Sequence, residues 1–384
     1  MKRRLRIAQA CIAGIALGSL VAGVRPSQSY TKDLQEEYLT AKALRDGLDI
    51  FTPVTELSAR YFPHSTDNFP HPSPHPPVLA LIGLPLTLVP FPAIVGFWLL
   101  VNLALLIAVG RWLRLSLPAT LPLAAWPPLW CLLYIGQFEL LILALALLGW
   151  RAAAAHRDWP AGWYLGLAAA IKLYPVLLLV PFLLRRRWRI LLAAGVVLAL
   201  SQVGNLLAVG PSGVYRYYSE VVPTVSSMYL RLGLNASPYG ALLRLFGGAT
   251  EVSPLISAPW LVVPATIALS LFAVISLARL DPEAAPLALL VGLPSVWYYY
   301  VVLALPEITL LLRSQTRRTA TLLACAAASF VLPLVNLVAQ WSGGQAPPMA
   351  VLLAIQPAGF VGLLMLALLH TEDRRASAAA GRAD

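Results

Sequence analysis

Residues 140–189 read LLILALALLGWRAAAAHRDWPAGWYLGLAAAIKLYPVLLLVPFLLRRRWR. Three apolar runs, at 138–150, 161–171 and 174–184, are separated by short polar or basic turns, and a cluster of arginines follows the last run. This alternation is typical of a chain that crosses a membrane repeatedly with its basic turns on the cytoplasmic side. The runs are shorter than the ~20 residues of a perpendicular span, which is tolerated where helices are buried among others.

The composition of the whole chain has the same character. Of its 384 residues, 59% are hydrophobic and only 12% are charged, and the mean hydropathy is +0.74. A soluble domain could not cover so much apolar surface. The net charge of +11 does not indicate nucleic-acid binding, because the basic residues form no patch among stacking aromatics. The composition predicts an all-α polytopic membrane protein, and the 32 prolines favour short, broken or kinked helices.

The N-terminal sequence sets the expected orientation. It begins MKRRLR and continues apolar to Gly23, which predicts an uncleaved first transmembrane helix with a cytoplasmic basic flank. We expect one integral membrane domain over 1–384, in a bacterial inner (plasma) membrane, with both termini cytoplasmic. Its parts are a first helix at 7–24, an extracytoplasmic catalytic loop at 25–76, the remaining transmembrane bundle at 77–370 and a cytoplasmic tail at 371–384.

One region leaves two topologies open. The segment 78–90 is short, contains Pro85 and ends at a proline, which predicts a re-entrant segment or half-helix. Alternatively, Arg111 and Arg114 face outward and 117–134 is the irregular segment. Further spans are expected near 138–150, 161–171, 174–184, 189–209, 255–278, 285–294, 299–312, 319–340 and 349–370.

The first loop opens with an amphipathic helix. Apolar residues recur at helical spacing over 33–46, and Gly47 is a plausible stop. Such a helix would lie in the membrane interface. Asp33, Glu36 and Glu37 share one face, and two interpretations stand: acidic residues suit a helix N-terminus, or one of them is a general base at the water–lipid boundary.

The same loop continues into a proline-rich stretch with three histidines, His64, His71 and His75. Prolines favour extended backbone, whereas a metal site needs ligands fixed on rigid elements. We therefore predict a substrate-lining loop and no metal site. A divalent metal stays open as an alternative, because Asp33, Glu37 and the histidines could supply ligands.

Lys172 is the most informative polar residue inside the apolar runs. A lysine there costs roughly 2.5–3.5 kcal/mol, which makes it a candidate functional residue. Pro175 should end the helix just beyond it, so the ammonium could reach a cavity and pair with an anion such as phosphate. The alternative is snorkelling to the interface.

Several other polar features are expected on the outer side with Lys172. Gln137 could contact ligand or only cap the next helix, as could Glu139. Arg244 could bind phosphate or be a surface arginine on an interfacial helix. The cluster Trp297–Tyr300 could be a sugar-stacking platform or an aromatic belt at the interface. The candidate ligand-binding residues on this side are Gln137, Asn235, Tyr298 and Tyr299.

Several segments together resemble glycosyltransferase family 87 of the GT-C superfamily, which uses polyprenyl-phosphate sugars. The resemblance covers about 30–340 and is carried by DLQEEYLTAKALRDG (33–47), HPPVLALIGLPL (75–86), the GQ-to-RRRWR stretch (136–189) and NASPYGALLRLFG (235–247). One departure is SVWYYY at 295–300, where family members often carry Ser-Trp followed by histidine.

The resemblance implies a GT-C-type fold with about 10–12 transmembrane or half-spanning helices. It further implies transfer of a hexose, mannose by family weighting, from a polyprenyl-phosphate donor to a lipid- or glycan-linked acceptor on the extracytoplasmic side, with inversion. Membrane lipids are the expected surroundings, with no nucleic-acid partner and no cofactor. By matching position, Asp33 is the general base, and Lys172 and Arg244 steady the donor phosphate. The residues expected to hold acceptor and sugar are Glu36, Glu37, His71, His75, Gln137, Asn235, Tyr298 and Tyr299.

Two other functions stay open. A transporter or flippase for a lipid-linked or small solute would explain broken helices and Lys172. It explains the acidic outer loop less well, and no internal repeat is visible. An inactive family member acting as an assembly subunit is the second alternative, because of the SVWYYY departure.

Overall fold

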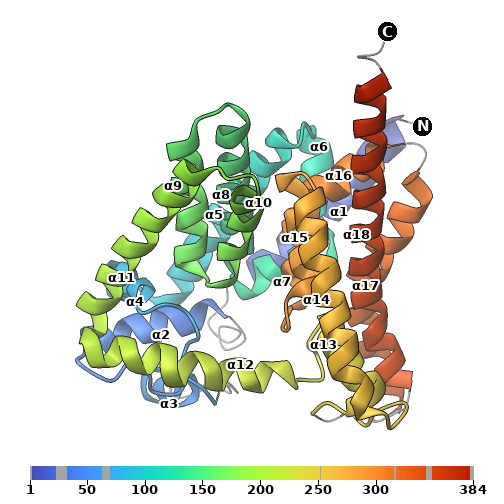
Figure 1. Ribbon diagram of the computed structural model, residues 1–384. Coiled ribbons are helices and arrows are strands. Elements are labelled where there is room, and N and C mark those ends of the chain that lie inside the picture. The colour runs from blue at the N-terminus through green and yellow to red at the C-terminus, as the bar shows by residue number, and fades with distance from the viewer. Residues whose placement is uncertain are drawn as a thin grey trace. The chain divides into compact units, whose positions relative to one another are not determined.

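The computed structural model describes residues 2–22, 33–62, 70–250, 252–314, 317–342 and 348–380 (Figure 1). Regular structure in these ranges is helical, apart from an isolated bridge between Ala249 and Val252. The chain divides into two compact units, Met1–Phe182 with Arg186–Val225, and Leu183–Arg185 with Ser226–Asp384. The all-α polytopic membrane fold predicted from composition is confirmed; the single integral membrane domain stays a prediction.

The first part of the chain contains eleven described α-helices. They are α1 (Lys2–Ala22), α2 (Leu34–Arg45), α3 (Val54–Tyr61), α4 (Val78–Gly83), α5 (Phe91–Trp112), α6 (Leu117–Thr120), α7 (Pro127–Ile135), α8 (Glu139–Ala154), α9 (Asp158–Ile171), α10 (Val180–Leu184) and α11 (Trp188–Arg216). Later helices are α12 (Val222–Leu230), α13 (Pro238–Leu242), α14 (Val262–Arg279), α15 (Ala285–Gly292), α16 (Leu305–Arg313), α17 (Arg318–Ser342) and α18 (Pro348–Ala380).

Four stretches of the described chain are long and apolar enough to cross a membrane: Phe91–Trp112, Trp188–Leu230, Pro259–Arg279 and Val351–Ser377. A fifth is present if α7 and α8, bent by 110° relative to each other, form one broken span. Shorter apolar helices lie at Ile7–Ala22, Val78–Leu88, Tyr174–Leu184 and Pro282–Gly292. The expectation of short and broken helices is therefore confirmed.

Both segments that left the topology open are broken. After α4, the chain continues as a 3-10 helix over Leu84–Leu88 and reaches Pro90 in extended geometry. The alternative segment is interrupted too, because α6 passes into a 3-10 helix at Leu121–Ala125 before α7 begins. Proline near the start of these pieces removes backbone donors and favours fresh helix starts. The side faced by Arg111 and Arg114 stays a prediction.

Three helices of the first unit, α8, α9 and α11, pack side by side (Figure 1). Small residues make this packing close: a Cβ added to Gly162 of α9 would lie 2.2 Å from the carbonyl oxygen of Ile190. Helix α9 ends at Ile171, three residues before the 3-10 helix that begins at Tyr174 and contains Pro175. The predicted end of this apolar run at 171 is confirmed as the end of α9, and Lys172 follows it directly.

Two predicted boundaries differ from the structure. The span expected from residue 255 begins later, because α14 starts at Val262 after a 3-10 turn at Pro259–Leu261. The predicted tail at 371–384 is helical as far as Ala380, because α18 continues through its polar end. Residues 381–384 of that predicted tail lie outside the described residues.

Candidate functional site

Asp33 immediately precedes α2, at the position where an acidic residue usually caps a helix. Its side chain makes no capping hydrogen bond to the helix backbone. Instead, Nε2 of Gln137 donates to Oδ2 of Asp33 at 2.5 Å. Capping of free N–H groups therefore does not account for this carboxylate, and its direction is set by a residue 104 positions away.

The start of α2 is fixed by apolar and aromatic packing. Leu34 and Tyr38 are buried in a cluster with Phe91, Ile94 and Val95 of α5. The hydroxyl of Tyr38 also donates to the carbonyl of Val89 at 3.0 Å. These contacts confirm the predicted amphipathic helix and hold its acidic first turn in place.

A sharp connector between α7 and α8 carries Gln137 to Asp33. Gly136 ends α7 with φ +81°, which places it in the left-handed region where glycine is favoured. Its carbonyl accepts a hydrogen bond from Nε1 of Trp98 at 2.8 Å. A Cβ on Gly136 would lie 2.9 Å from Cβ of Leu34, so the connector and the start of α2 are in intimate contact. Sequence reasoning missed Gly136 and Trp98; a glycine closing an apolar run was the available signal.

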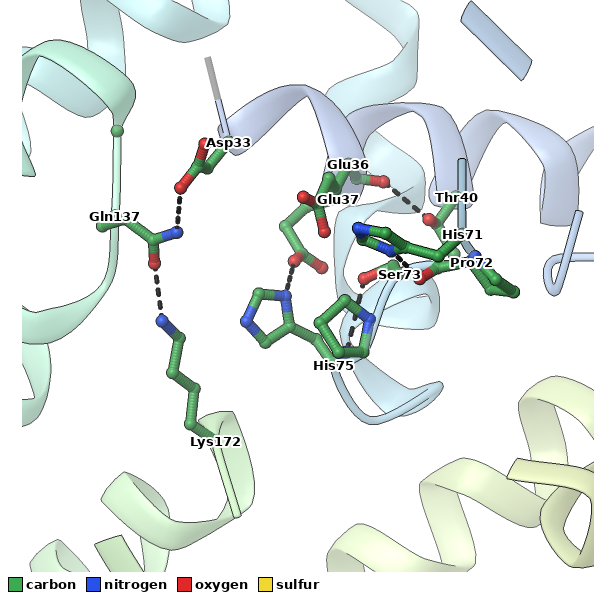
Figure 2. Close-up of polar contacts among 12 residues, drawn as sticks. Asp33, Glu36, Glu37, Thr40, His71, Pro72, Ser73, His75, Gln137 and Lys172 are labelled. Carbon is green, nitrogen blue, oxygen red and sulfur yellow. Dashed lines mark hydrogen bonds and ion pairs between the residues drawn. The ribbon is translucent and has the colours of Figure 1, made fainter. Parts of the chain in front are cut away.

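Lys172 reaches the same amide from the other side. It leaves α9 in extended geometry, and Nζ donates to Oε1 of Gln137 at 2.6 Å and to Oε1 of Glu139 at 2.6 Å. Lys172 and Glu139 are buried, with 6% and 0% of their surface exposed. Figure 2 shows Gln137 between Asp33 and Lys172. Glu139, for which the sequence left a ligand contact and a cap of the next helix open, is thus the ion-pair partner of Lys172.

A second acidic residue of α2 pairs with a histidine of the loop. The carboxylate of Glu37 and Nδ1 of His75 are in hydrogen-bonding contact in a largely buried position, and the contact is an ion pair when the imidazole is protonated (Figure 2). The imidazole also lies edge-on to Phe138, with ring centroids 5.9 Å apart. Asp33 and Glu37 are four residues apart on one helix, so the ion pair lies one turn along α2 from the Asp33–Gln137 contact.

Glu36 and His71 are held by local backbone contacts. The carbonyl of Glu36 accepts from the Thr40 hydroxyl at 2.6 Å, and the Glu36 residue is 5% exposed. Nδ1 of His71 lies 2.8 Å from the carbonyl of Pro72, and burial lowers the pKa of His71. Their predicted roles in binding stay predictions.

The surroundings of Asp33 favour the protonated form of its carboxyl group more than water does. Burial raises the pKa of Asp33 from 3.8 to about 6. The hydrogen bond from Gln137 and the charges of Lys172 and His75 act against this rise, whereas the charge of Glu139 adds to it. A carboxylate with such a pKa is mostly ionised at pH 7 and is a better proton acceptor than an ordinary aspartate.

A metal site is not apparent in the described part of the chain. Across residues 2–22, 33–62, 70–250, 252–314, 317–342 and 348–380, no three His, Cys, Asp or Glu side chains are grouped so that they could hold a metal ion. His64 lies outside these ranges. Metal dependence therefore stays untested.

The other candidates lie in the second unit, where Arg244, Asn235 and Tyr298 hydrogen-bond to backbone groups. Arg244 is fully buried and donates to the carbonyls of Gly233, Asn235 and Leu353 at 3.0, 2.7 and 2.9 Å. The interpretation of Arg244 as a surface arginine is therefore wrong. Its proposed contact with phosphate is untested.

The amide of Asn235 bridges two segments of the second unit. Oδ1 accepts from the backbone N–H groups of Ser237 and Val296, and Nδ2 donates to the carbonyl of Pro294 at 2.9 Å. Tyr298 and Tyr299 are 7% and 4% exposed, and the Tyr298 hydroxyl donates to the Ser329 carbonyl. Burial argues against an aromatic belt made by these two tyrosines.

Comparison with known proteins gives consistent matches. Two relatives have the same name, polyprenol-phosphate-mannose-dependent alpha-(1-2)-phosphatidylinositol pentamannoside mannosyltransferase. The protein from Mycobacterium tuberculosis is 27% identical over 283 residues, covering 70% of this chain and 64% of the relative. The protein from Mycolicibacterium smegmatis is 30% identical over 203 residues, covering 50% of this chain and 48% of the relative. The matches thus span between about half and just under two thirds of the relatives' lengths.

No solved structure matches the chain significantly. The model of Glycosyltransferase family 87 matches residues 74–306, which is more than half of the chain and includes Gln137 and Lys172. Because the match is this extensive, the chain belongs to glycosyltransferase family 87.

Proposed function

We propose that this protein is a membrane glycosyltransferase that moves a mannose-like hexose from a polyprenyl-phosphate donor to a hydroxyl of a lipid- or glycan-linked acceptor. Family membership supports a glycosyltransferase, and the donor named for both relatives, polyprenol-phosphate-mannose, supports the donor class. The observation that carries the proposal is the Asp33 carboxylate. It is directed by Gln137 instead of capping its helix, and its pKa of about 6 suits a base.

The proposed reaction needs one base and no general acid. The acceptor oxygen attacks the anomeric carbon, and the hydroxyl proton moves to Asp33. The bond from that carbon to the phosphate oxygen breaks, and its electron pair leaves with the phosphate. Because phosphate is a stable anion, its departure does not require protonation, in contrast to glycosidases with two carboxylic residues. Direct displacement inverts the anomeric configuration.

Side chains beside the base would hold the substrates. Glu37 lies one turn along α2 from Asp33 and contacts His75 of the loop before α4, and both side chains are proposed to contact hydroxyls of the sugar or acceptor. We place the reaction on the extracytoplasmic side, since the acidic first loop is expected there. Glu36, His71, Asn235, Tyr298 and Tyr299 are retained as predicted contacts without an assigned partner atom.

The experiment is transfer of radiolabelled mannose from polyprenyl-phosphate mannose to membrane acceptors by the purified full-length protein. Wild type is compared with Asp33→Asn, and Asp46→Asn at the opposite end of α2 is the matched control. Asp46 contacts Arg45 and Tyr61 on the surface, so its substitution should leave transfer within about twofold of wild type. Loss of transfer only in Asp33→Asn supports the proposal.

The other outcomes are equally informative. Equal transfer by wild type and Asp33→Asn would keep the transferase and reject Asp33 as the base. No transfer by wild type from mannose or other polyprenyl-phosphate hexoses would reject the activity and favour a carrier or an assembly subunit.

A further inference from the structure

We propose that Glu139, Lys172 and Gln137 form a positioning chain that directs Asp33, with Lys172 acting through the Gln137 amide and not as a ligand of the donor phosphate. This inference rests on the proposed function, because it assigns roles around the proposed base. It differs from the expectation that the family resemblance raised for Lys172. Four segments contribute: the start of α2, the connector before α8, the first residue of α8 and the residue after α9.

The hydrogen-bond donors and acceptors of Lys172 and Asp33 allow only one orientation of the Gln137 side-chain amide between them. An ammonium group can only donate hydrogen bonds, so Lys172 requires the oxygen of Gln137 to face it. The amide nitrogen must then face Asp33, whose ionised carboxylate can only accept. Without Lys172, the Gln137 side chain could turn its oxygen towards Asp33, which would repel the carboxylate instead of holding it.

The charge of Lys172 is already matched by a protein carboxylate. Glu139 is fully buried, and its Oε1 lies 2.6 Å from Nζ of Lys172. Drawing Lys172 away to a substrate phosphate would leave Glu139 as a buried charge without its partner, which is strongly unfavourable. At least two of the three ammonium donors are thus used within the protein. A positioning role is compatible with these contacts as they stand.

The positioning contacts involve only one of the two carboxylate oxygens of Asp33. Gln137 binds Oδ2 of Asp33, and Oδ1 has no hydrogen bond to another described residue. A carboxylate with one oxygen held and the other open can accept a proton from a hydroxyl in a defined direction. The contacts therefore fix where the acceptor oxygen should approach, on the Oδ1 side.

The charged groups around Asp33 make the inference testable through the pH dependence of activity. From α8, Glu139 raises the pKa of Asp33; from the end of α9, Lys172 lowers it; and from the loop before α4, His75 lowers it while paired with Glu37 of α2. Cys131 of α7 also interacts electrostatically with Asp33. Removing the charge of Lys172 and removing the charge of Glu139, one at a time, should therefore shift the acidic limb of the pH–activity profile in opposite directions.

The test measures kcat and donor KM against pH for the full-length protein with polyprenyl-phosphate mannose. For Lys172→Met we expect kcat to fall by at least about tenfold and the acidic limb to move up by about one pH unit. For Glu139→Gln, which keeps an oxygen for Lys172, we expect that limb to move down. Donor KM should stay within about twofold in both variants, and Lys172→Arg should recover part of kcat.

Gln137 provides an independent variant if Lys172→Met does not fold. Gln137→Glu places a second carboxylate against Asp33 and should raise the acidic limb, whereas Gln137→Met removes the hydrogen bond without adding charge and should lower kcat with a smaller shift. A rise in donor KM of about tenfold with unchanged kcat in Lys172→Met would overturn the inference and make Lys172 a phosphate ligand. Shifts of the same sign in Lys172→Met and Glu139→Gln would also overturn it. Absence of transfer in wild type would reject the proposed function itself, and this inference with it.

Discussion

Replacing Gly136 with alanine should separate the base from the amide that holds it. Gly136 has φ +81°, a region that costs an L-residue roughly 1–2 kcal/mol. The new Cβ would also lie 2.9 Å from Cβ of Leu34, well inside normal van der Waals contact. Overpacking of this kind typically costs about 1–3 kcal/mol. The free energy of unfolding should therefore fall by about 2–5 kcal/mol, combining backbone strain with steric overlap.

Activity should fall further than stability alone explains. Leu34 directly follows Asp33, so relief of the overlap moves the start of α2 and lengthens the 2.5 Å contact from Gln137 to Asp33. A displacement near 1 Å at a reacting group can lower the rate about 100-fold. The assay is kcat for sugar transfer, measured beside the melting temperature of the purified protein in detergent.

Gly47, at the other end of α2, is the matched control. It has φ +70°, but a Cβ added there would meet no atom within 4 Å. Gly47→Ala therefore introduces similar backbone strain without the overlap and should lower the melting temperature less, with kcat near wild type. If Gly136→Ala and Gly47→Ala lose the same stability and the same activity, contact between the connector and α2 does not position the base.

Two further predictions concern stability. Because burial raises the pKa of Asp33 above its unfolded value of 3.8, the folded state favours the protonated carboxyl; the stability from this group is present below pH 4 and is lost as pH rises through about 6. Asp33→Asn should thus raise the melting temperature at pH 7.5, by the equivalent of about 1–3 kcal/mol, even as transfer is lost; an unchanged or lower value would contradict the burial argument. In the second unit, Arg244→Lys should lower the melting temperature, because lysine cannot reach three carbonyls together. Unchanged stability with a raised donor KM would instead show that Arg244 contacts phosphate.

Local features of the site were accessible from the sequence. The spacing of Leu34 and Tyr38 predicts α2 and the face that it buries, and Gly47 marks the end with its positive φ. Pro175 predicts the end of α9 and hence the placement of Lys172 after it. These inferences succeed because helix starts and stops depend on residues within one or two turns.

Contacts between residues that are distant in the sequence could not be predicted from the sequence in the same way. Asp33, Gln137 and Lys172 are separated by 104 and 35 positions, and the bend of 110° between α7 and α8 brings the amide between the two charges. Periodicity does not encode such a bend. Arg244 illustrates the same limit: its position in an outer segment suggests a surface, yet the side chain is enclosed by three carbonyls from two separate segments, the loop at 233–235 and α18.

The energetics of the buried ion pair favour a functional reason for its presence. Lys172 and Glu139 lie in a chain where apolar residues dominate, and a well-packed apolar pair of similar volume is often as stable as a buried ion pair or more so. Neither charge is needed to solubilise an exposed surface, because both side chains are enclosed. What an apolar pair could not do is fix the orientation of the Gln137 amide. The contact from that amide to Asp33 thus connects a costly feature of the fold to a carboxyl group whose pKa burial raises to about 6.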